Sequence, residues 1–208
     1  MKKISIFAIL AAACSIAGAT TVNVPSSLTG SDALAGQNAY SWGIPITLGA
    51  GQSVASASIS FQNITLTAAN SSGKGYLYTD LLNDSATGVH TFTDNDAPGD
   101  YFATKYSSPN IVSLGTEVFR SVGTTLSWTY TLTSTQLASL NEFLTSGVFN
   151  IGFDPDCHYT VGCISFNYST TPPPPTNVPD MAVTAYLLGL GLLALEVSRR
   201  KLAMAKSK

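Results

Sequence analysis

Three carboxylates, those of Asp94, Asp96 and Asp100, fall within one seven-residue stretch with the sequence DNDAPGD. Oxygen ligands clustered on a loop are what Ca²⁺ prefers, so these residues form a candidate calcium site. The spacing is not that of an EF-hand, because Pro98 occupies the fifth position and Lys105 the twelfth. The alternative is a solvated turn between strands, since Asp, Asn, Pro and Gly are the common turn residues.

A second stretch, DPDCHYTVGC, runs from Asp154 to Cys163. Asp154 and Asp156 are another candidate for a cation. Cys157 and Cys163 are the only cysteines after the leader, and in an exported chain they predict a disulfide that closes the loop HYTVG between two strands. The alternative is a reactive thiol, but apart from a lone histidine no basic residue stands near in the sequence to activate it.

No catalytic motif stands out in the chain. His90 and His158 are the two histidines, and the patterns GxSxG, HExxH and a Gly-rich phosphate loop are all missing. A glycosidase uses a pair of carboxylates, but nothing in the sequence marks such a pair. We therefore predict no enzymatic activity, and a secreted esterase or glycosidase is the least supported alternative.

The charge of the region between the two ends is strongly negative. Residues 20–180 contain three basic residues, Lys74, Lys105 and Arg120, against eleven acidic ones, a net charge of −8. This balance argues against nucleic acids and anionic surfaces as partners, because both would be repelled. It suits divalent cations, or simple repulsion between molecules outside the cell.

Short alternating segments predict an all-β fold. In the stretch LSWTYTL, Leu126, Trp128, Tyr130 and Leu132 alternate with Ser and Thr, as in a half-buried strand. Residues 57–67 also alternate, with a phase slip at Gln62-Asn63 that predicts a bulge. Further strands are expected at residues 40–48, 75–82, 111–114, 148–153 and 164–168. Together they predict an antiparallel β-sandwich, of jelly-roll type, over residues 20–169.

One short helix is expected within this sandwich. Ser134-Thr135-Gln136 is a helix start, and the helix is predicted to end at Gly147. Its apolar side chains recur at helical spacing and form one stripe: Leu137, Leu140, Phe143 and Leu144.

The first 19 residues have the composition of a secretory signal peptide. Two lysines precede an apolar run, and Ala17-Gly18-Ala19 is a cleavage site of the A-x-A type. Cys14 follows three alanines and suggests lipidation as an alternative, but Ala11 stands where a lipoprotein signal has leucine. The sequence therefore predicts export.

The other end of the chain has the layout of a membrane-held tail. Residues 170–177 include four consecutive prolines and predict a semi-rigid tether in polyproline II form. Val178-Pro179-Asp180 then precedes an apolar run over residues 181–197, which is at the low limit for a transmembrane helix. Arg199, Arg200 and Lys201 follow it and are expected on the cytoplasmic side.

Residues 178–208 resemble the PEP-CTERM class of bacterial sorting signals, in particular the variant that begins VPDSG. Val178-Pro179-Asp180, the apolar helix and Arg199-Arg200-Lys201 carry the resemblance, whereas Met181-Ala182 replaces the Ser-Gly of the variant. The resemblance implies an exosortase, a membrane-embedded cysteine transpeptidase, as partner. The DPDCH segment is similar to the closing segment of many β-sandwich proteins sorted in this way.

These observations predict an exported protein, held briefly in the inner membrane and then located at the cell surface or outside the cell. The expected role is structural or adhesive, in association with extracellular polysaccharide. The alternative is a carbohydrate-binding module, which would need aromatic side chains exposed on one face. The candidates for such a face are Tyr40, Trp42, Tyr76 and Tyr78.

Overall fold

The chain folds into two antiparallel sheets in the computed structural model, which describes residues 19–95, 99–172 and 188. The first sheet has the strand order β1-β10-β4-β8, with β2 paired to β10. Its members are β1 (Thr20–Asn23), β2 (Gly30–Leu34), β4 (Val54–Ala68), β8 (Thr125–Thr131) and β10 (His158–Thr170). The second sheet has the order β6-β3-β9-β5-β7. It contains β3 (Asn38–Pro45), β5 (Gly75–Leu82), β6 (Gly88–Thr93), β7 (Ile111–Phe119) and β9 (Val148–Pro155).

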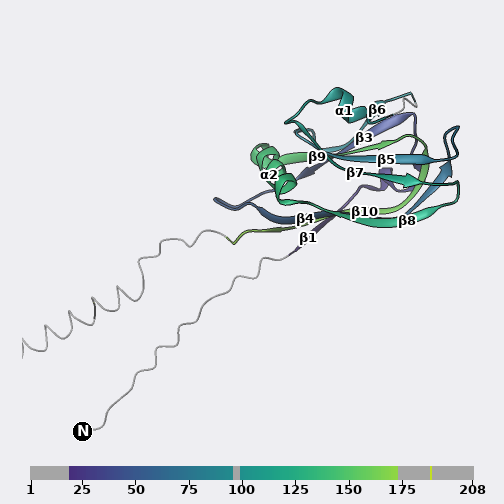
Figure 1. Ribbon diagram of the computed structural model, residues 1–208. Coiled ribbons are helices and arrows are strands. Elements are labelled where there is room, and N and C mark those ends of the chain that lie inside the picture. The colour runs from purple at the N-terminus through teal and green to yellow at the C-terminus, as the bar shows by residue number, and fades with distance from the viewer. Residues whose placement is uncertain (1–18, 96–98, 173–187, 189–208) are drawn as a thin grey trace, which may run out of the picture. The chain divides into compact units, whose positions relative to one another are not determined.

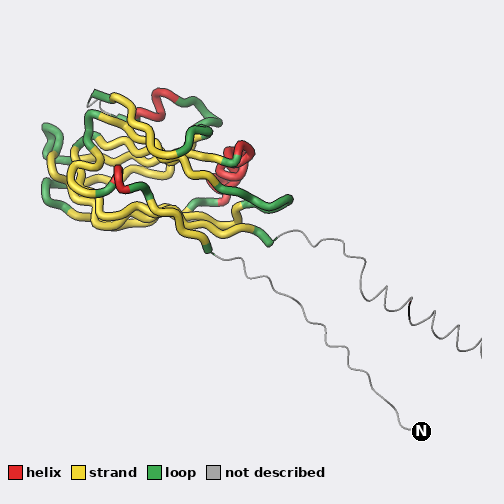
Figure 2. The backbone as a smooth tube through the Cα atoms, turned by 180° about the vertical axis from the view of Figure 1, so that it is seen from behind, coloured by secondary structure: helices red, strands yellow, loops and turns green. Residues whose placement is uncertain are grey.

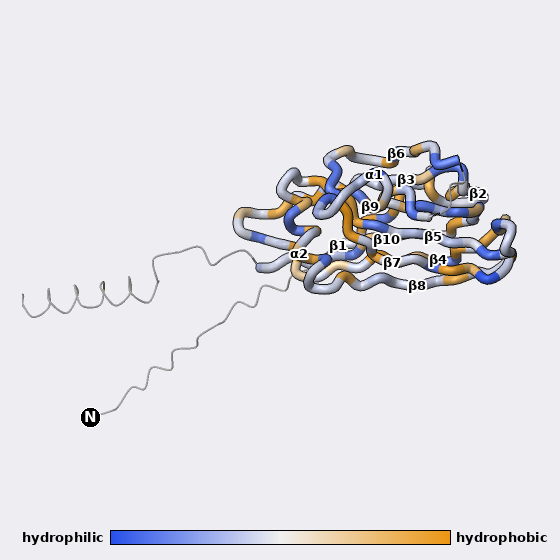
Figure 3. Tube along the Cα trace, turned by 45° about the horizontal axis from the view of Figure 1, so that its top comes forward, coloured by the Kyte–Doolittle hydropathy of each residue, from blue (hydrophilic) through white to orange (hydrophobic). Residues whose placement is uncertain are grey.

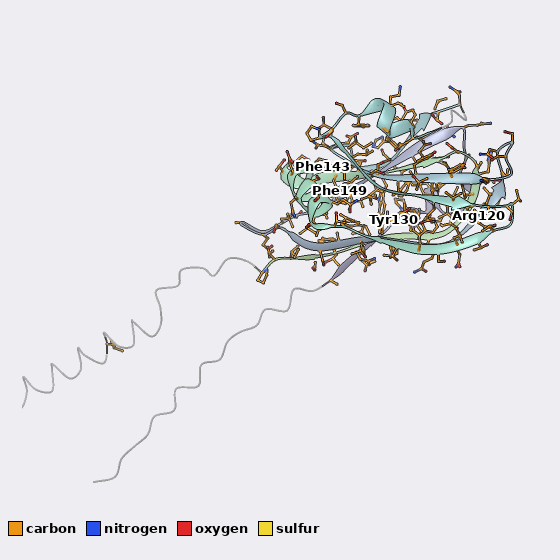
Figure 4. The ribbon with its side chains drawn as sticks, viewed as in Figure 1. Arg120, Tyr130, Phe143 and Phe149 are labelled. Carbon is orange, nitrogen blue, oxygen red and sulfur yellow. The ribbon has the colours of Figure 1, made fainter. Side chains whose placement is uncertain are left out.

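The two sheets pack face to face around one apolar core, so the predicted all-β sandwich is confirmed (Figure 1). Phe61 of β4 lies at the contact between the layers. Its ring stacks on Trp128 of β8, with centroids 4.4 Å apart, and meets Phe153 of the second sheet edge to face at 6.0 Å. Figure 4 shows Tyr130 and Phe149 directed into the same interior.

The strand patterns of the sequence have a direct structural counterpart. On β8, Leu126, Trp128 and Tyr130 pack against the core while the intervening Ser and Thr residues are exposed. On β4, the expected phase slip is a β-bulge, because Gln62 and Asn63 together oppose one residue of β8. The N–H of Asn63 donates to Oγ of Ser127 across the bulge at 2.9 Å.

Helices cover only small parts of the sandwich (Figure 2). They are α1 (Tyr101–Lys105), α2 (Ser134–Phe143) and the 3-10 turns Ser26–Leu28 and Leu144–Ser146. The predicted helix is α2, and a capping box formed by Thr133 and Gln136 starts it. Leu140, Phe143 and Leu144 are buried and Leu137 packs beside them, which confirms the apolar stripe.

The predicted disulfide between Cys157 and Cys163 is wrong, since the structure contains no such bond. The segment HYTVG is not a loop but the first part of β10, which pairs with β4 from His158 to Thr170. Five residues of extended chain lie between the two cysteines and separate their Cα atoms by about 20 Å, whereas a disulfide needs about 4–7 Å.

The glycine at the end of this segment has a specific packing role. A Cβ on Gly162 would lie 2.7 Å from the carbonyl oxygen of Gln62, inside the bulge of β4. Glycine therefore lets β10 pass close to the bulge without leaving the ladder.

The two ends of the sandwich lie side by side. Thr20 pairs with Tyr168, so β1 begins where β10 ends. Just beyond β10, the N–H of Thr171 donates to the carbonyl of Ser53 at 2.8 Å and fixes the last residues to β4. The chain therefore enters and leaves the domain at the same edge.

The predicted signal peptide lies outside the described residues apart from exposed Ala19. The sorting motif, the apolar run over 181–197 apart from Leu188, and the basic cluster also lie outside them. None of the helices in the described part of the chain is long and apolar enough to cross a membrane.

Candidate functional site

The outer face of the second sheet, turned away from the main core, is partly covered by α1 (Figure 1). Leu81 of β5 belongs to the main core, whereas the next residue, Leu82, packs with Phe102 of α1 and Ala39 of β3. Gly152 of β9 lies below the Phe102 ring, and an added Cβ there would come within 2.7 Å of it. The absence of a side chain at this position lets α1 approach the sheet.

Carboxylates from several segments converge on this face. Asp80 of β5 lies opposite Gly152, and Asp154 of β9 lies opposite Tyr78. Asp100 stands at the start of α1, and the charges of Asp94 and Asp156 act on Asp154. We call these five residues the acidic cluster: Asp80, Asp94, Asp100, Asp154 and Asp156.

Backbone N–H groups at the start of α1 hold three members of the cluster. The carboxylate of Asp100 caps α1 by accepting from the N–H groups of Phe102 and Ala103, at 2.9 and 3.1 Å. The N–H of Tyr101 donates to Oδ2 of Asp154 at 2.6 Å. The N–H of Gly99 donates to the carboxylate of Asp156. The loop that contains Asp100 is thus bound to the strand end that contains Asp154.

Burial sets the electrostatics of the cluster. Asp80 and Asp154 have no exposed surface, and Asp94 is 8 % exposed. Neither oxygen of Asp80 has a hydrogen-bond partner of good geometry, and Oδ1 of Asp154 has none either. Asp100 nevertheless lies close to Asp80, so a proton on one of the two carboxyl groups can be shared with the other. Buried carboxyls without counter-ions favour the protonated form.

The pKa values follow from this environment. Burial, followed by the charge of Asp100, raises the pKa of Asp80 to about 8. Burial also raises the pKa of Asp154 to about 7, with the charge of Asp94 adding to it against the hydrogen bond from Tyr101. For Asp156, burial and Asp94 raise the pKa to about 6. The cluster therefore retains protons near neutral pH, unlike ordinary carboxylates.

The predicted calcium residues are brought together in part. Asp94 and Asp100 lie with Asp154 and Asp156, so the two candidate stretches of the sequence contribute to one cluster, whereas Asp96 lies outside the described residues. Within residues 19–95 and 99–172, no group of three or more His, Cys, Asp and Glu side chains is placed to hold a metal ion.

Asp80 is the member that sequence reasoning missed. Its signal is a carboxylate inside the apolar strand YLYTDLL, where an ordinary strand would have an uncharged residue.

The aromatic candidates divide into two groups. Tyr40 and Trp42 face the core and are only 7 % and 3 % exposed, so they cannot belong to an exposed binding face. Tyr76 and Tyr78 are half-exposed on β5, and their rings stack with centroids 6.4 Å apart. The carboxylates of Asp156, Asp154 and Asp100 lie near enough to Tyr78 to raise its phenol pKa, after burial as the main cause.

Cys157 and His158 lie beside the cluster rather than in it. Together with Asp156 and residues 68–70 they line a surface pocket of about 350 Å³. Cys157 is 4 % exposed, and its thiol donates to the carbonyl of Lys74 at 3.4 Å. The other histidine, His90, contacts the backbone carbonyl of Thr87 at 3.1 Å.

No protein-family model, curated protein or solved structure matches the chain.

The stability of the metal-free, full-length protein is expected to fall as the pH rises from about 4 to about 8. The pKa values of Asp80, Asp154 and Asp156 are raised from 3.8 in the folded protein, so unfolding in this range releases protons. The stability contributed is complete below the unfolded pKa and is lost as the pH passes the folded pKa values. Thermal unfolding in the presence of a chelator, at a series of pH values, measures this dependence.

Two variants test whether the buried carboxyl of Asp80 is a source of this pH dependence. Asp80→Asn should reduce the loss of stability between pH 6 and pH 9, because the amide stays neutral throughout. Glu142→Gln removes the same single charge from an exposed position on α2 and should leave the slope unchanged. A melting temperature that rises over this pH range, or equal effects of the two variants, would contradict the assignment.

Proposed function

We propose that the protein is an exported cell-surface or extracellular-matrix component with a structural or adhesive role, associated with extracellular polysaccharide. The observation that carries this proposal is the adjacency of the domain ends, where Thr20 pairs with Tyr168 and Thr171 is bound to Ser53. The leader and the Pro-rich tether therefore join the sandwich at one edge. A domain connected in this way can be displayed on a stalk with its sheets exposed to the surroundings.

The sorting tail supports the route to the surface. Val178-Pro179-Asp180, the apolar run over residues 181–197 and Arg199-Arg200-Lys201 would hold the protein in the inner membrane until an exosortase-type transpeptidase acts on it. The short apolar run suits a transient anchor.

We propose more specifically that the β-sandwich has the topology of a jelly roll. In one sheet β2, β10, β4 and β8 follow one another, and in the other β3, β9, β5 and β7. Successive strands thus alternate between the sheets from β2 to β5 and from β7 to β10, which supports two Greek keys wound together. In this proposal β6 and α1 are an insertion that brings Asp94 and Asp100 to the outer face.

A carbohydrate-binding module is the second candidate function. The observation that favours it is the stacked pair of Tyr76 and Tyr78, half-exposed beside Asp154 and Asp156. Aromatic faces with adjacent hydrogen-bond acceptors suit sugar rings.

Mass spectrometry of the surface fraction tests the sorting proposal. We expect a mature form that begins near Thr20 and lacks the residues from about 182 onward, because the tail is cleaved after the sorting motif. Replacing Pro179 and Asp180 by alanine should leave the tail attached, whereas replacing Pro173 and Pro174 in the tether should not. A surface form that still ends at Lys208 would refute the proposal.

We also propose that calcium binds at the acidic cluster, with Asp94, Asp100, Asp154 and Asp156 as the carboxylates involved. Buried oxygens without partners on Asp154 and Asp156 support this proposal. Binding would require the carboxylates to move closer together than they are in the metal-free structure. The gain is that a cation would replace the retained protons and screen the carboxylates, which repel one another once they are ionised.

Thermal unfolding of the full-length protein, in calcium and in a chelator at matched ionic strength, tests calcium binding. Extracellular modules bind calcium with dissociation constants of about 10⁻⁴–10⁻³ M. At a concentration tenfold above such a constant, the stabilisation is about 1.4 kcal/mol, or a few degrees. Asp154→Asn should abolish the shift and Glu142→Gln should preserve it. Identical melting curves for the unmodified protein would leave the segment as an ordinary turn.

A further inference from the structure

The outer face of the first sheet, opposite to the side that carries the acidic cluster, is built from small hydroxyl and amide side chains. They are aligned across the sheet in register. One row crosses β1, β10, β4 and β8 through Thr21, Asn167, Ser58 and Thr131. The next row crosses the same strands through Asn23, Ser165, Ser60 and Thr129. All eight side chains are exposed or half-exposed. We call this surface the hydroxyl face.

The hydroxyl face is uncharged. β1, β4, β8 and β10 contain no Asp, Glu, Lys or Arg, although residues 20–180 carry a net charge of −8. The fifth strand of the sheet, β2, does carry Asp32, which accepts a hydrogen bond from Thr67 of β4 beyond the two rows. The pale, intermediate hydropathy along β8 in Figure 3 reflects the same composition. A face of this kind has no large apolar side chain to drive burial against a second copy or a membrane. It also provides no cation to attract an acidic partner.

Hydrogen bonds between neighbouring strands hold these side chains in place. Oγ of Ser60 and Oγ1 of Thr129 are 3.0 Å apart, and the hydroxyl of Thr21 donates to Oδ1 of Asn167 at 2.6 Å. A hydroxyl has one donor and two acceptor sites, so each paired group keeps further capacity to bind a ligand. Because the side chains are already ordered, a ligand would lose less conformational entropy on binding.

The face is also hollowed at two places. The β-bulge of β4 opens a depression of about 330 Å³ whose polar lining is Ser60, Gln62, Asn63, Ser127 and Thr129. A second depression, of about 180 Å³, lies toward the chain ends and is lined in part by Ser58, Thr131 and Asn167. Both are wide and shallow, and strands about 4.8 Å apart give their polar groups a regular spacing.

We infer that the hydroxyl face binds an uncharged polysaccharide, through hydrogen bonds between its hydroxyl and amide groups and the sugar hydroxyls. Sugar hydroxyls both donate and accept, as these side chains do. An uncharged polymer is not repelled by the net charge of the domain, whereas a polyuronate would be. This inference rests on the proposed association with extracellular polysaccharide and assigns it to one surface.

Retention of the full-length protein on polysaccharide gels tests the inference. The probes are neutral gels of cellulose, curdlan, cross-linked dextran and agarose, with calcium alginate as the anionic comparison. We expect retention on at least one neutral gel that does not weaken in high salt, because no charge pair contributes. We expect no retention on alginate. Failure on every neutral gel, or retention that high salt abolishes, would overturn the inference.

Substitutions on and away from the hydroxyl face test whether it is the surface that binds the polysaccharide. Thr129→Glu should weaken retention about tenfold or more, because it places an unpaired charge among neutral hydroxyls. The double variant Ser60→Ala with Thr129→Val removes two hydroxyls without adding charge, and it should weaken retention in the same direction while keeping strand propensity. Thr135→Glu adds the same charge at an exposed position of α2 and should have no effect.

Two other results would contradict the inference and leave the proposed function intact. If Tyr76→Ala with Tyr78→Ala abolishes retention while the variants of the hydroxyl face do not, the second sheet binds the polysaccharide. If light scattering shows a dimer that Thr129→Glu dissociates, a second copy covers the face. The mass-spectrometric test of export is independent of both results.

Discussion

The pairing of β10 with β4 is the interaction on which the rest of the domain depends. The last strand of the sandwich lies inside the first sheet, with β1 on one side and β4 on the other. The ladder extends over nearly the full length of both strands, so the sheet forms only when sequence-distant segments meet. It sets the register of the hydroxyl rows and leaves the other edge of β10 to pair with β1, which brings the two ends of the domain together. It also holds Cys157 and Cys163 apart.

The sequence predicts those parts of the fold that depend on residues close together in the chain. The alternation of LSWTYTL places Trp128 in the core, and the slip at Gln62-Asn63 is a bulge, because strand periodicity depends on adjacent residues. The helix start at Ser134-Thr135-Gln136 and the stripe through Leu140 identify α2 for the same reason, and the structure places the cap one residue earlier, at Thr133. Gly162 shows where local reading fails. Its role is to accommodate the bulge of a strand about a hundred residues away in sequence, which no neighbouring residue indicates.

The acidic cluster could be predicted only in pieces. Each of the two acidic stretches was recognisable as a possible cation site, but their meeting depends on α1 docking over Gly152, which no local pattern encodes. Asp80 completes the cluster from a strand whose other residues are uncharged, and its burial follows from α1 covering that strand. The two faces of the sandwich therefore differ in kind. One concentrates buried carboxyls under a short helix, and the other presents ordered neutral hydroxyls.

The continuous β4–β10 ladder is tested most directly by the state of the two thiols. Cys157 lies in the core and Cys163 is half-exposed on the outer face of β10. Unreduced protein should be alkylated at Cys163 while folded and at both cysteines after unfolding, as mapped by peptide mass spectrometry. A Cys157–Cys163 linked peptide, lighter by two hydrogens and resistant to alkylation in denaturant, would contradict the ladder and restore the loop between two strands.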